Sequence, residues 1–372
     1  MDLATIDMSP LHHSAGGGSK RVLIVRLGSM GDIVHALPAL VTLKENFPAW
    51  EVDWLVERRW RGLLDGNPYL NRVVEFDTLK WRSSLFSSFA WREFGGALRQ
   101  VRERRYDYAI DLQGALKSAV ACRLSGARQV LGFERPWLRE PGASVFYTRR
   151  IHSDAVHIVE ANLALAAALG ARHPVFRFPL PTGDVTAIPP PWRDGAIAML
   201  NPGAGWQAKQ WPAAGYAEVC DEIEQQYRLP VIINCGPGEA ALAGKIQGAC
   251  RLAHPQPFSG SIAGLIALLR RARLMVGPDT GPLHLAAALG VPTVALFGPT
   301  DPERNGPYGN SHRNLRPENA ITSHRRSGGR NEVMDRILPS QVLAAVRELL
   351  AEQGQVRAEA GCVATDSRGA TS

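Results

Sequence analysis

Short apolar runs alternate with amphipathic stretches along most of this 372-residue chain. The apolar runs are hydrophobic on both faces, as expected of parallel strands that helices cover on two sides. Between them, apolar residues recur with the period of a helix. Strands are predicted at residues 22–27, 51–57, 73–78, 106–112, 129–133, 196–201, 230–235, 274–277 and 292–297. Helices are predicted at residues 32–46, 88–104, 157–169, 213–227, 239–249, 261–272 and 281–289.

Residues 179–195 interrupt the alternation, because this stretch is rich in proline and has no periodicity. It is predicted to be a linker between two α/β units, residues 21–178 and 196–338. Each unit is expected to be a doubly wound parallel sheet with right-handed crossovers. A last helix is expected at residues 339–353.

The composition is that of a globular protein, with 45% hydrophobic and 21% charged residues. No apolar run reaches the roughly 18–20 residues that cross a bilayer, and the N-terminus does not resemble a signal peptide. Residues 1–20 and 354–372 are rich in small and polar residues, so we expect a disordered leader and a disordered tail. Widely spaced cysteines without a C-x-x-C pair argue against a disulfide framework and a zinc site, and favour the cytoplasm. The net charge of +7, with clustered arginines, indicates an anionic partner or an ordinary solvated face.

Loops that follow strands are the candidate sites, because ligands of doubly wound sheets lie at the carboxyl ends of the strands. The first such loop reads Gly28-Ser29-Met30-Gly31-Asp32, and its glycines allow close approach of the backbone. Asp32 is interpreted either as a helix cap or as a base that faces a substrate. The loop is not G-x-G-x-x-G, which disfavours a nicotinamide dehydrogenase.

Two loops in the second half fit a phosphate group. In NPGAGWQAKQWP, residues 201–212, glycines leave backbone amides open beside the positive charge of Lys209. In GPDTGPLHLAAALG a helix begins after Asp279, and its first amides, the Thr280 hydroxyl and His284 can face an anion. Taken alone, each loop also fits an ordinary connection, the first with a solvated lysine and the second with a well-capped helix.

Together the three loops predict a diphosphate held by the second half and a carboxylate base supplied by the first, across a cleft. When an activated sugar is transferred, a carboxylate can take the proton of the attacking hydroxyl. Helix amides and Lys209 can stabilise the leaving diphosphate without a metal, and the chain has no D-x-D pair to hold one. Attack from the face opposite the leaving group would invert the anomeric carbon.

Five motifs stand in a fixed order: VLIVRLGSMGDIVHALPAL, DLQGALKSA, LREPGASVFY, NPGAGWQAKQWP and VGPDTGPLHLAAALGVPTVALFGPTDP. In this order and spacing they resemble the bacterial lipopolysaccharide heptosyltransferases of glycosyltransferase family 9, and most closely heptosyltransferase I, over residues 21–350. The resemblance implies a GT-B fold, that is, two Rossmann-like α/β domains facing across a cleft, with the last helix crossing back to the N-terminal domain. It also implies transfer of L-glycero-D-manno-heptose from ADP-heptose to the inner Kdo of Kdo2-lipid A, with no cofactor.

The resemblance assigns roles to individual residues. It makes Asp32 the catalytic base and Glu239 the contact to the nucleoside. The other donor-binding residues that it implies are Lys209, Asp279, Thr280, Gly281 and His284. The acceptor-binding residues that it implies are Ser29, Gly31, Arg82, Gln113, Lys117 and Arg139.

Some features depart from the family pattern. The loop at residues 201–212 is closer to the second heptosyltransferase, and residues 318–336 match nothing in the family. The alternatives are therefore an enzyme that adds the second heptose, a sugar-nucleotide epimerase and a non-catalytic nucleotide-sugar binder. No motif supports a nucleic-acid partner. The anionic acceptor implies a cytoplasmic enzyme that is peripheral to the inner face of the inner membrane.

Overall fold

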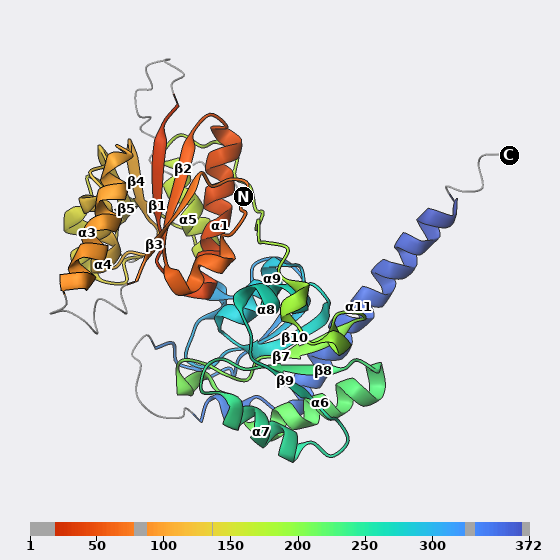
Figure 1. The fold of residues 1–372 in the computed structure, drawn as a ribbon. Coiled ribbons are helices and arrows are strands. Elements are labelled where there is room, and N and C mark those ends of the chain that lie inside the picture. Colours follow the sequence, from red (N-terminus) through yellow and green to blue (C-terminus); the bar gives the residue numbers. More distant parts are fainter. Residues whose placement is uncertain (1–18, 78–87, 136, 324–331, 367–372) are drawn as a thin grey trace. The chain divides into compact units, whose positions relative to one another are not determined.

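The computed structural model of the chain describes residues 19–77, 88–135, 137–323 and 332–366 (Figure 1). The chain divides into two compact units between Thr182 and Gly183. This boundary falls inside the stretch in which a linker is expected. Each unit has its own sheet and its own hydrophobic core. The predicted leader lies almost entirely outside the described residues.

The sheet of the first unit has six parallel strands in the order β3-β2-β1-β4-β5-β6. The strands are β1 (Arg21–Val25), β2 (Glu51–Glu57), β3 (Arg72–Phe76), β4 (Tyr108–Asp111), β5 (Gln129–Phe133) and β6 (Arg149–Ile151). β1 pairs with β2 and β4, and Val22, Leu23, Ile24 and Val25 are fully buried. Burial on both faces explains why this strand reads as a continuous apolar run.

Helices cover both faces of this sheet. α1 (Met30–Asn46) and α5 (Ile158–Ala167) pack side by side on one face, and α3 (Ser88–Glu103) and α4 (Leu116–Leu124) lie on the other (Figure 1). Two short 3-10 helices, η1 (Arg58–Leu63) and η2 (Pro141–Phe146), follow β2 and β5. The α1–α5 contact contains a buried hydrogen bond in which the Asn162 side chain donates to the carbonyl of His35 (3.0 Å).

The sheet of the second unit has six parallel strands in the order β12-β11-β10-β7-β8-β9. The strands are β7 (Ile197–Leu200), β8 (Val231–Asn234), β9 (Gln256–Phe258), β10 (Ala272–Pro278), β11 (Thr293–Leu296) and β12 (His312–Leu315). Counted from its own first strand, this order is the same as that of the first unit. Both are the order of a Rossmann sheet, which confirms the predicted fold class for each unit.

The helices of the second unit follow the same plan. They are α6 (Ala213–Tyr227), α7 (Ala240–Ala249), α8 (Ile262–Leu269), α9 (Gly281–Ala288), α10 (Pro302–Asn305) and α11 (Pro339–Asp366). α11 packs against α6 and the strands β10 to β12, as α5 packs against α1 in the first unit. Val342, Val346 and Leu349 of α11 are buried in the core of the second unit. The predicted crossing of this helix to the N-terminal half stays a prediction.

α11 is longer than the sequence indicates. The predicted tail begins at residue 354, whereas the helix runs to Asp366. Gly354 is the first residue of that predicted tail. A glycine inside a helix costs only about 1 kcal/mol relative to alanine, so it does not by itself end one.

Five helices and strands, α4, α10, β6, β9 and β12, are not in the sequence-based prediction. β6 and β9 have three residues each, too few for a hydrophobic pattern to show. β12 is an edge strand that reads His312-Arg313-Asn314-Leu315 and is mostly polar. Within the described ranges, no helix is long and apolar enough to cross a membrane.

Candidate functional site

Each sheet has a topological switch point, where successive strands begin to be added on the opposite side. It lies between β1 and β4 in the first unit and between β7 and β10 in the second. Ligands of doubly wound sheets bind outside the carboxyl ends of the strands at this point. The connections that follow these four strands are residues 26–29, 112–115, 201–206 and 279–280. Most of the predicted site residues lie in these connections or in the first turn after them.

Asp32 lies in the first turn of α1, and its side chain is 34% exposed. Its Oδ2 accepts hydrogen bonds from the backbone N–H of Ser29 (2.8 Å) and from the Ser29 hydroxyl (2.9 Å). The first of these bonds is half of a capping box, so Asp32 does cap the helix. Its Oδ1 lies 2.6 Å from Nη2 of Arg26, whose side chain is 7% exposed. Capping therefore uses one carboxylate oxygen, and the other oxygen pairs with Arg26.

The surroundings of Asp32 keep it charged. Burial alone would raise its pKa, but the charge of Arg26 and the hydrogen bonds from Ser29 outweigh burial and hold the pKa below its ordinary value. The charge of Arg139 acts in the same direction. Asp32 is thus a carboxylate at neutral pH, with lone pairs that can accept a proton. This state fits a base and does not fit an acid.

Two other features of this loop serve packing. A Cβ on Gly28 would come within 2.8 Å of the indole Nε1 of Trp60, so only glycine fits against this ring. His35 is 4% exposed, and its ring lies 5.5 Å from the ring of His157 in an edge arrangement. The first glycine of the motif is therefore explained by the approach of Trp60.

Asp111, at the end of β4, is fully buried and organises the next loop. Its Oδ1 accepts from the backbone N–H of Gln113 (2.9 Å). Its Oδ2 accepts from the hydroxyls of Ser118 (3.0 Å) and Tyr147 (2.7 Å). Burial raises the pKa of Asp111 in spite of these bonds. Gln113 is 7% exposed, and its Oε1 accepts from the N–H of Leu27 (2.9 Å), which ties this loop to the loop of Asp32.

The segment that carries Arg139 is clamped onto the same loop. Gly114 has φ +66°, and a Cβ there would lie 3.2 Å from the Cα of Leu138. The carbonyl of Gly114 accepts from the N–H of Glu140 (3.0 Å), and the Glu140 carboxylate accepts from the N–H of Leu116 (2.7 Å). Arg139 is exposed between these contacts. The structure thus brings the motifs of Asp32, Gln113 and Arg139 together at one end of the first sheet.

The remaining acceptor residues have mixed outcomes. Ser29 is the N-cap of α1, and Gly31 is buried in its first turn. Lys117 is half exposed, with its ammonium 3.6 Å from Oε1 of the buried Glu57. Arg82 lies outside the described residues. The acceptor roles of all these residues stay predictions.

In the second unit, Asp279 contacts two other predicted donor-binding residues, Lys209 and His284. Its Oδ2 lies 2.6 Å from Nζ of Lys209, which also donates to the Asp279 carbonyl (3.0 Å). Its Oδ1 lies 2.8 Å from Nε2 of His284. Burial would raise the pKa of Asp279, but the hydrogen bond from His284 and the charge of Lys209 outweigh it and hold the pKa well below its ordinary value. Asp279 therefore fixes the positions of Lys209 and His284.

Asn201 connects the loops of the second unit. This residue follows β7 and is 3% exposed. Its Nδ2 donates to the carbonyl of Gly203 (3.1 Å) and to the hydroxyl of Thr280 (3.0 Å). Its Oδ1 accepts from the side chain of Asn234 at the end of β8 (2.6 Å). The loops after β7 and β10 are thus held together by one buried amide.

Glu239 lies against the same group of loops. Its Oε2 accepts from the N–H of Gly236 (2.6 Å). A Cβ on Gly203 would come within 2.0 Å of the Glu239 carboxyl carbon, so the carboxylate occupies the space that a side chain at 203 would need. The structure therefore places Glu239 beside the predicted phosphate loop.

Three residues that hold the loops of the candidate site in place were not predicted: Arg26, Asp111 and Asn201. Each is a polar residue at or just after the end of an apolar strand, next to a switch point. A polar residue at the end of an apolar strand is the sequence signal that could have identified them. Their long-range contacts, such as Arg26 to Leu112 and Asn201 to Thr280, depend on which strands are neighbours.

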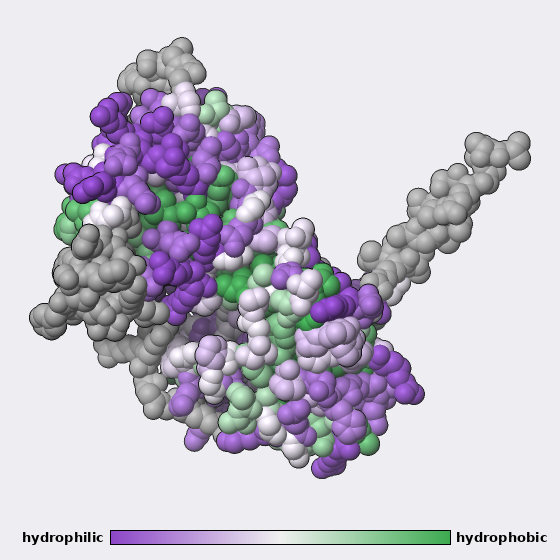
Figure 2. Space-filling model, viewed as in Figure 1, coloured by the Kyte–Doolittle hydropathy of each residue, from purple (hydrophilic) through white to green (hydrophobic). Residues whose placement is uncertain are grey.

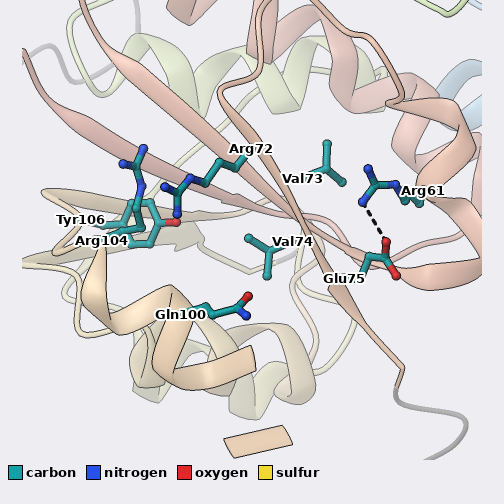
Figure 3. Close-up of a pocket in the computed structure, with 8 residues that line it drawn as sticks. All are labelled: Arg61, Arg72, Val73, Val74, Glu75, Gln100, Arg104 and Tyr106. Atoms are coloured by element: carbon teal, nitrogen blue, oxygen red, sulfur yellow. Dashed lines mark hydrogen bonds and ion pairs between the residues drawn. The ribbon is translucent and has the colours of Figure 1, made fainter. Parts of the chain in front are cut away.

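A cavity of about 410 Å³ lies beside β3, the edge strand of the first unit (Figure 3). The arginines that line it include two with partners: Arg61 Nη1 lies 2.8 Å from Glu75, and Arg104 Nε lies 3.0 Å from Asp53. Among the described residues, none of the predicted site residues lines it. This cavity is therefore separate from the candidate site.

Part of the positive charge forms structural ion pairs. Arg58 Nε lies 3.0 Å from Glu75, and Arg104 Nη2 lies 2.7 Å from Glu51. Figure 2 shows hydrophilic residues over much of the visible face of the first unit. Arg58 and Arg104 thus belong to a hydrophilic face on which charges are paired. In the part of the chain that the structure describes, no group of three His, Cys, Asp or Glu side chains is placed to hold a metal ion.

Comparisons with known proteins show which family the chain belongs to. Residues 96–333 match the model of glycosyltransferase family 9 (heptosyltransferase). Lipopolysaccharide heptosyltransferase 1 of Pseudomonas aeruginosa is 36% identical over 310 residues, which cover 79% of this chain and 83% of that protein.

Solved structures are similar over most of their length. Escherichia coli heptosyltransferase WaaC with ADP has a TM-score of 0.73 and 28% identity, and the match covers 88% of this chain and 99% of that one. The same enzyme with ADP-2-deoxy-2-fluoro heptose has a TM-score of 0.71 and 27% identity, again over 88% and 99% of the two chains.

Proposed function

Since the chain belongs to glycosyltransferase family 9, the lipopolysaccharide heptosyltransferases, we propose that it moves L-glycero-D-manno-heptose from ADP-heptose to the inner Kdo of Kdo2-lipid A. Family membership makes the chain a glycosyltransferase, and its two Rossmann-like units belong to the GT-B fold class. The donor, the acceptor and the inverting route are the proposal. The observation that carries it is Asp32, an ionised and partly exposed carboxylate at the switch point of the first unit.

The residues of the second unit support the donor. The similar WaaC structures contain ADP and an ADP-heptose analogue. In this chain the ammonium of Lys209 and the first amides of α9, from Gly281 on, can stabilise a diphosphate. Thr280 and His284 are held beside them by Asn201 and Asp279. Glu239, beside Gly203, is proposed to contact the nucleoside.

The proposed reaction is a single displacement. The acceptor hydroxyl oxygen bonds to the anomeric carbon, and its proton passes to Asp32. The bond from that carbon to the diphosphate oxygen breaks, and its electron pair leaves with ADP. Lys209 and the helix amides stabilise the charge that ADP gains. Attack opposite the leaving group inverts the anomeric carbon, and the scheme needs no cofactor.

The relatives favour the first heptose over the alternatives. The Pseudomonas aeruginosa protein named above is a heptosyltransferase 1. We propose accordingly that the acceptor is Kdo2-lipid A, and that the enzyme works in the cytoplasm at the inner face of the inner membrane. The exposed Arg139 and the half-exposed Lys117 suit such an anionic acceptor.

A transfer assay tests this proposal. ADP-heptose is incubated with Kdo2-lipid A, with an acceptor that already carries one heptose, and with no acceptor. We expect ADP release and a single heptose adduct only with Kdo2-lipid A. NMR of the product should show that the anomeric carbon of the transferred heptose has the configuration opposite to that in ADP-heptose. With the acceptor in vesicles, transfer should fall as salt rises, because screening weakens attraction to an anionic surface.

The other outcomes identify the alternatives. Turnover of only the heptose-bearing acceptor would indicate addition of the second heptose. Conversion of ADP-heptose without an acceptor would indicate an epimerase. Donor binding with no turnover in any arm would indicate a non-catalytic binder.

A further inference from the structure

Asp32 has a partner that the proposed reaction does not yet explain. Both of its carboxylate oxygens are bonded, Oδ2 to Ser29 and Oδ1 to Arg26. Each carboxylate oxygen has two lone-pair positions. Oδ1 of this partly exposed side chain therefore retains a lone-pair position for an acceptor hydroxyl beside its pair with Arg26.

Arg26 is held in place by contacts within the protein. Its side chain is 7% exposed, and Nη1 donates to the carbonyl of Leu112 in the loop after β4. Its own carbonyl accepts from the indole N–H of Trp54 (3.2 Å). The two ends of the guanidinium thus hold Leu112 and Asp32 at once, which the single ammonium group of a lysine does not reproduce.

We propose that Arg26 is a positioning residue that keeps Asp32 ionised and oriented while an anionic acceptor is bound. This inference rests on the proposed function, because that acceptor brings a carboxylate and phosphates to the site. Each added negative charge favours the protonated form of a nearby carboxylate, and a protonated Asp32 is not a base. Arg26 opposes this from a buried position, where salt screens its charge little.

The charges that lower the pKa of Asp32 most are those of Arg26, from the loop after β1, and Arg139, from the loop after β5. Arg139 is exposed, so solvent and salt screen its charge, and an anionic acceptor can pair with it directly. The buried Arg26 is shielded from solvent and salt and from direct pairing with the acceptor. Arg26, rather than Arg139, therefore keeps Asp32 ionised during turnover.

The test compares pH profiles of heptose transfer for the wild type, Arg26→Gln and Arg26→Lys. In the wild type, Asp32 should stay active to acidic pH, because its pKa is lowered. We compare the rate at about pH 5 with the rate at about pH 8 for each protein. This drop should be at least about tenfold larger in Arg26→Gln than in the wild type, because the positive charge paired with Asp32 is lost. Arg26→Lys should restore the wild-type profile with a lower kcat. A parallel loss at every pH in Arg26→Gln would overturn the inference.

Controls separate this inference from the proposed function. Arg128→Gln removes an arginine whose side chain is 81% exposed, just before β5 and away from the carboxyl ends of the strands, and should leave the profile unchanged. If Asp32→Asn retains full transfer, the role of Asp32 in the proposed function fails. If Asp32→Asn is inactive and Arg26→Gln follows the wild-type profile, only the role of Arg26 fails.

A second measurement does not depend on the stability of a variant. NMR of wild-type protein with ¹³C-labelled aspartate carboxyl groups, with Asp32 assigned through Asp32→Asn, follows ionisation directly. Asp32 should stay ionised at about pH 5 with and without Kdo2-lipid A bound, because Arg26 remains paired with it. Protonation of Asp32 near neutral pH when the acceptor binds would contradict the inference.

Discussion

Asp32 divides two tasks between its two oxygens. Oδ2 caps α1 through Ser29, and Oδ1 pairs with Arg26 and is the oxygen proposed to receive a proton. Removing a helix cap costs about 1 kcal/mol, so an alanine at this position would mix a folding defect with a chemical one. Asparagine retains an oxygen that can accept from the N–H of Ser29. Asp32→Asn therefore removes the base and preserves most of the cap.

Gly203 is predicted to be needed for donor binding. In Gly203→Ala the new Cβ would come within 2.0 Å of the Glu239 carboxyl carbon, so the carboxylate must move. We expect the Kd for ADP to rise about tenfold, because roughly one hydrogen bond from the nucleoside to the Glu239 carboxylate is lost. The Tm of the protein should change little. Isothermal titration calorimetry measures this. In the matched control Gly205→Ala the Cβ meets nothing within 4 Å, and ADP affinity should not change. Equal affinities in the two variants would exclude this role of Glu239.

The residues proposed to act could be identified from the sequence, but those that hold them could not. Asp32, Lys209 and Asp279 stand in glycine-containing loops after strands, which local pattern reveals. Arg26 and Asn201 were missed because each is also held by a residue that is distant in sequence. Arg26 contacts Leu112, and Asn201 contacts Thr280, only because β1 lies beside β4 and β7 beside β10.

At the scale of elements, the structure repeats one plan. In both units a helix after the sixth strand, α5 or α11, returns to pack on the first helix of that unit. Central strands such as β1 and β7 were predicted because burial on both faces leaves long apolar runs. The edge strands β6, β9 and β12 were missed because they are short or polar.

The packing of α11 leads to a prediction on stability. Leu349 is 1% exposed in the core of the second unit. Leu349→Ala should lower the free energy of unfolding of that unit by about 2–5 kcal/mol, because it leaves a cavity. Urea unfolding of the whole chain measures this, and the transition of the second unit is the one that ADP shifts. Ala344→Ser, at an exposed position of the same helix, should change little. A loss confined to the transition that ADP does not shift would contradict this packing.

At the scale of the whole molecule, two units of one topology carry different chemistry at the same place in the fold. The switch point of the first unit presents a carboxylate paired with an arginine, and that of the second presents a lysine and a histidine joined by an aspartate. The proposed function assigns the acceptor and its base to the first unit and the donor to the second. Substitutions in the two units should therefore separate rate from donor affinity.

The most direct test of the account measures heptose transfer and donor binding together in Asp32→Asn. We predict that kcat with Kdo2-lipid A falls at least about 100-fold, because the general base is lost. We predict that the Kd for ADP-heptose stays within about twofold of the wild type, because a base that takes a proton in the transition state adds little to ground-state binding. Retention of wild-type kcat, or a loss of donor affinity as large as the loss of rate, would contradict the central claim that Asp32 is the base.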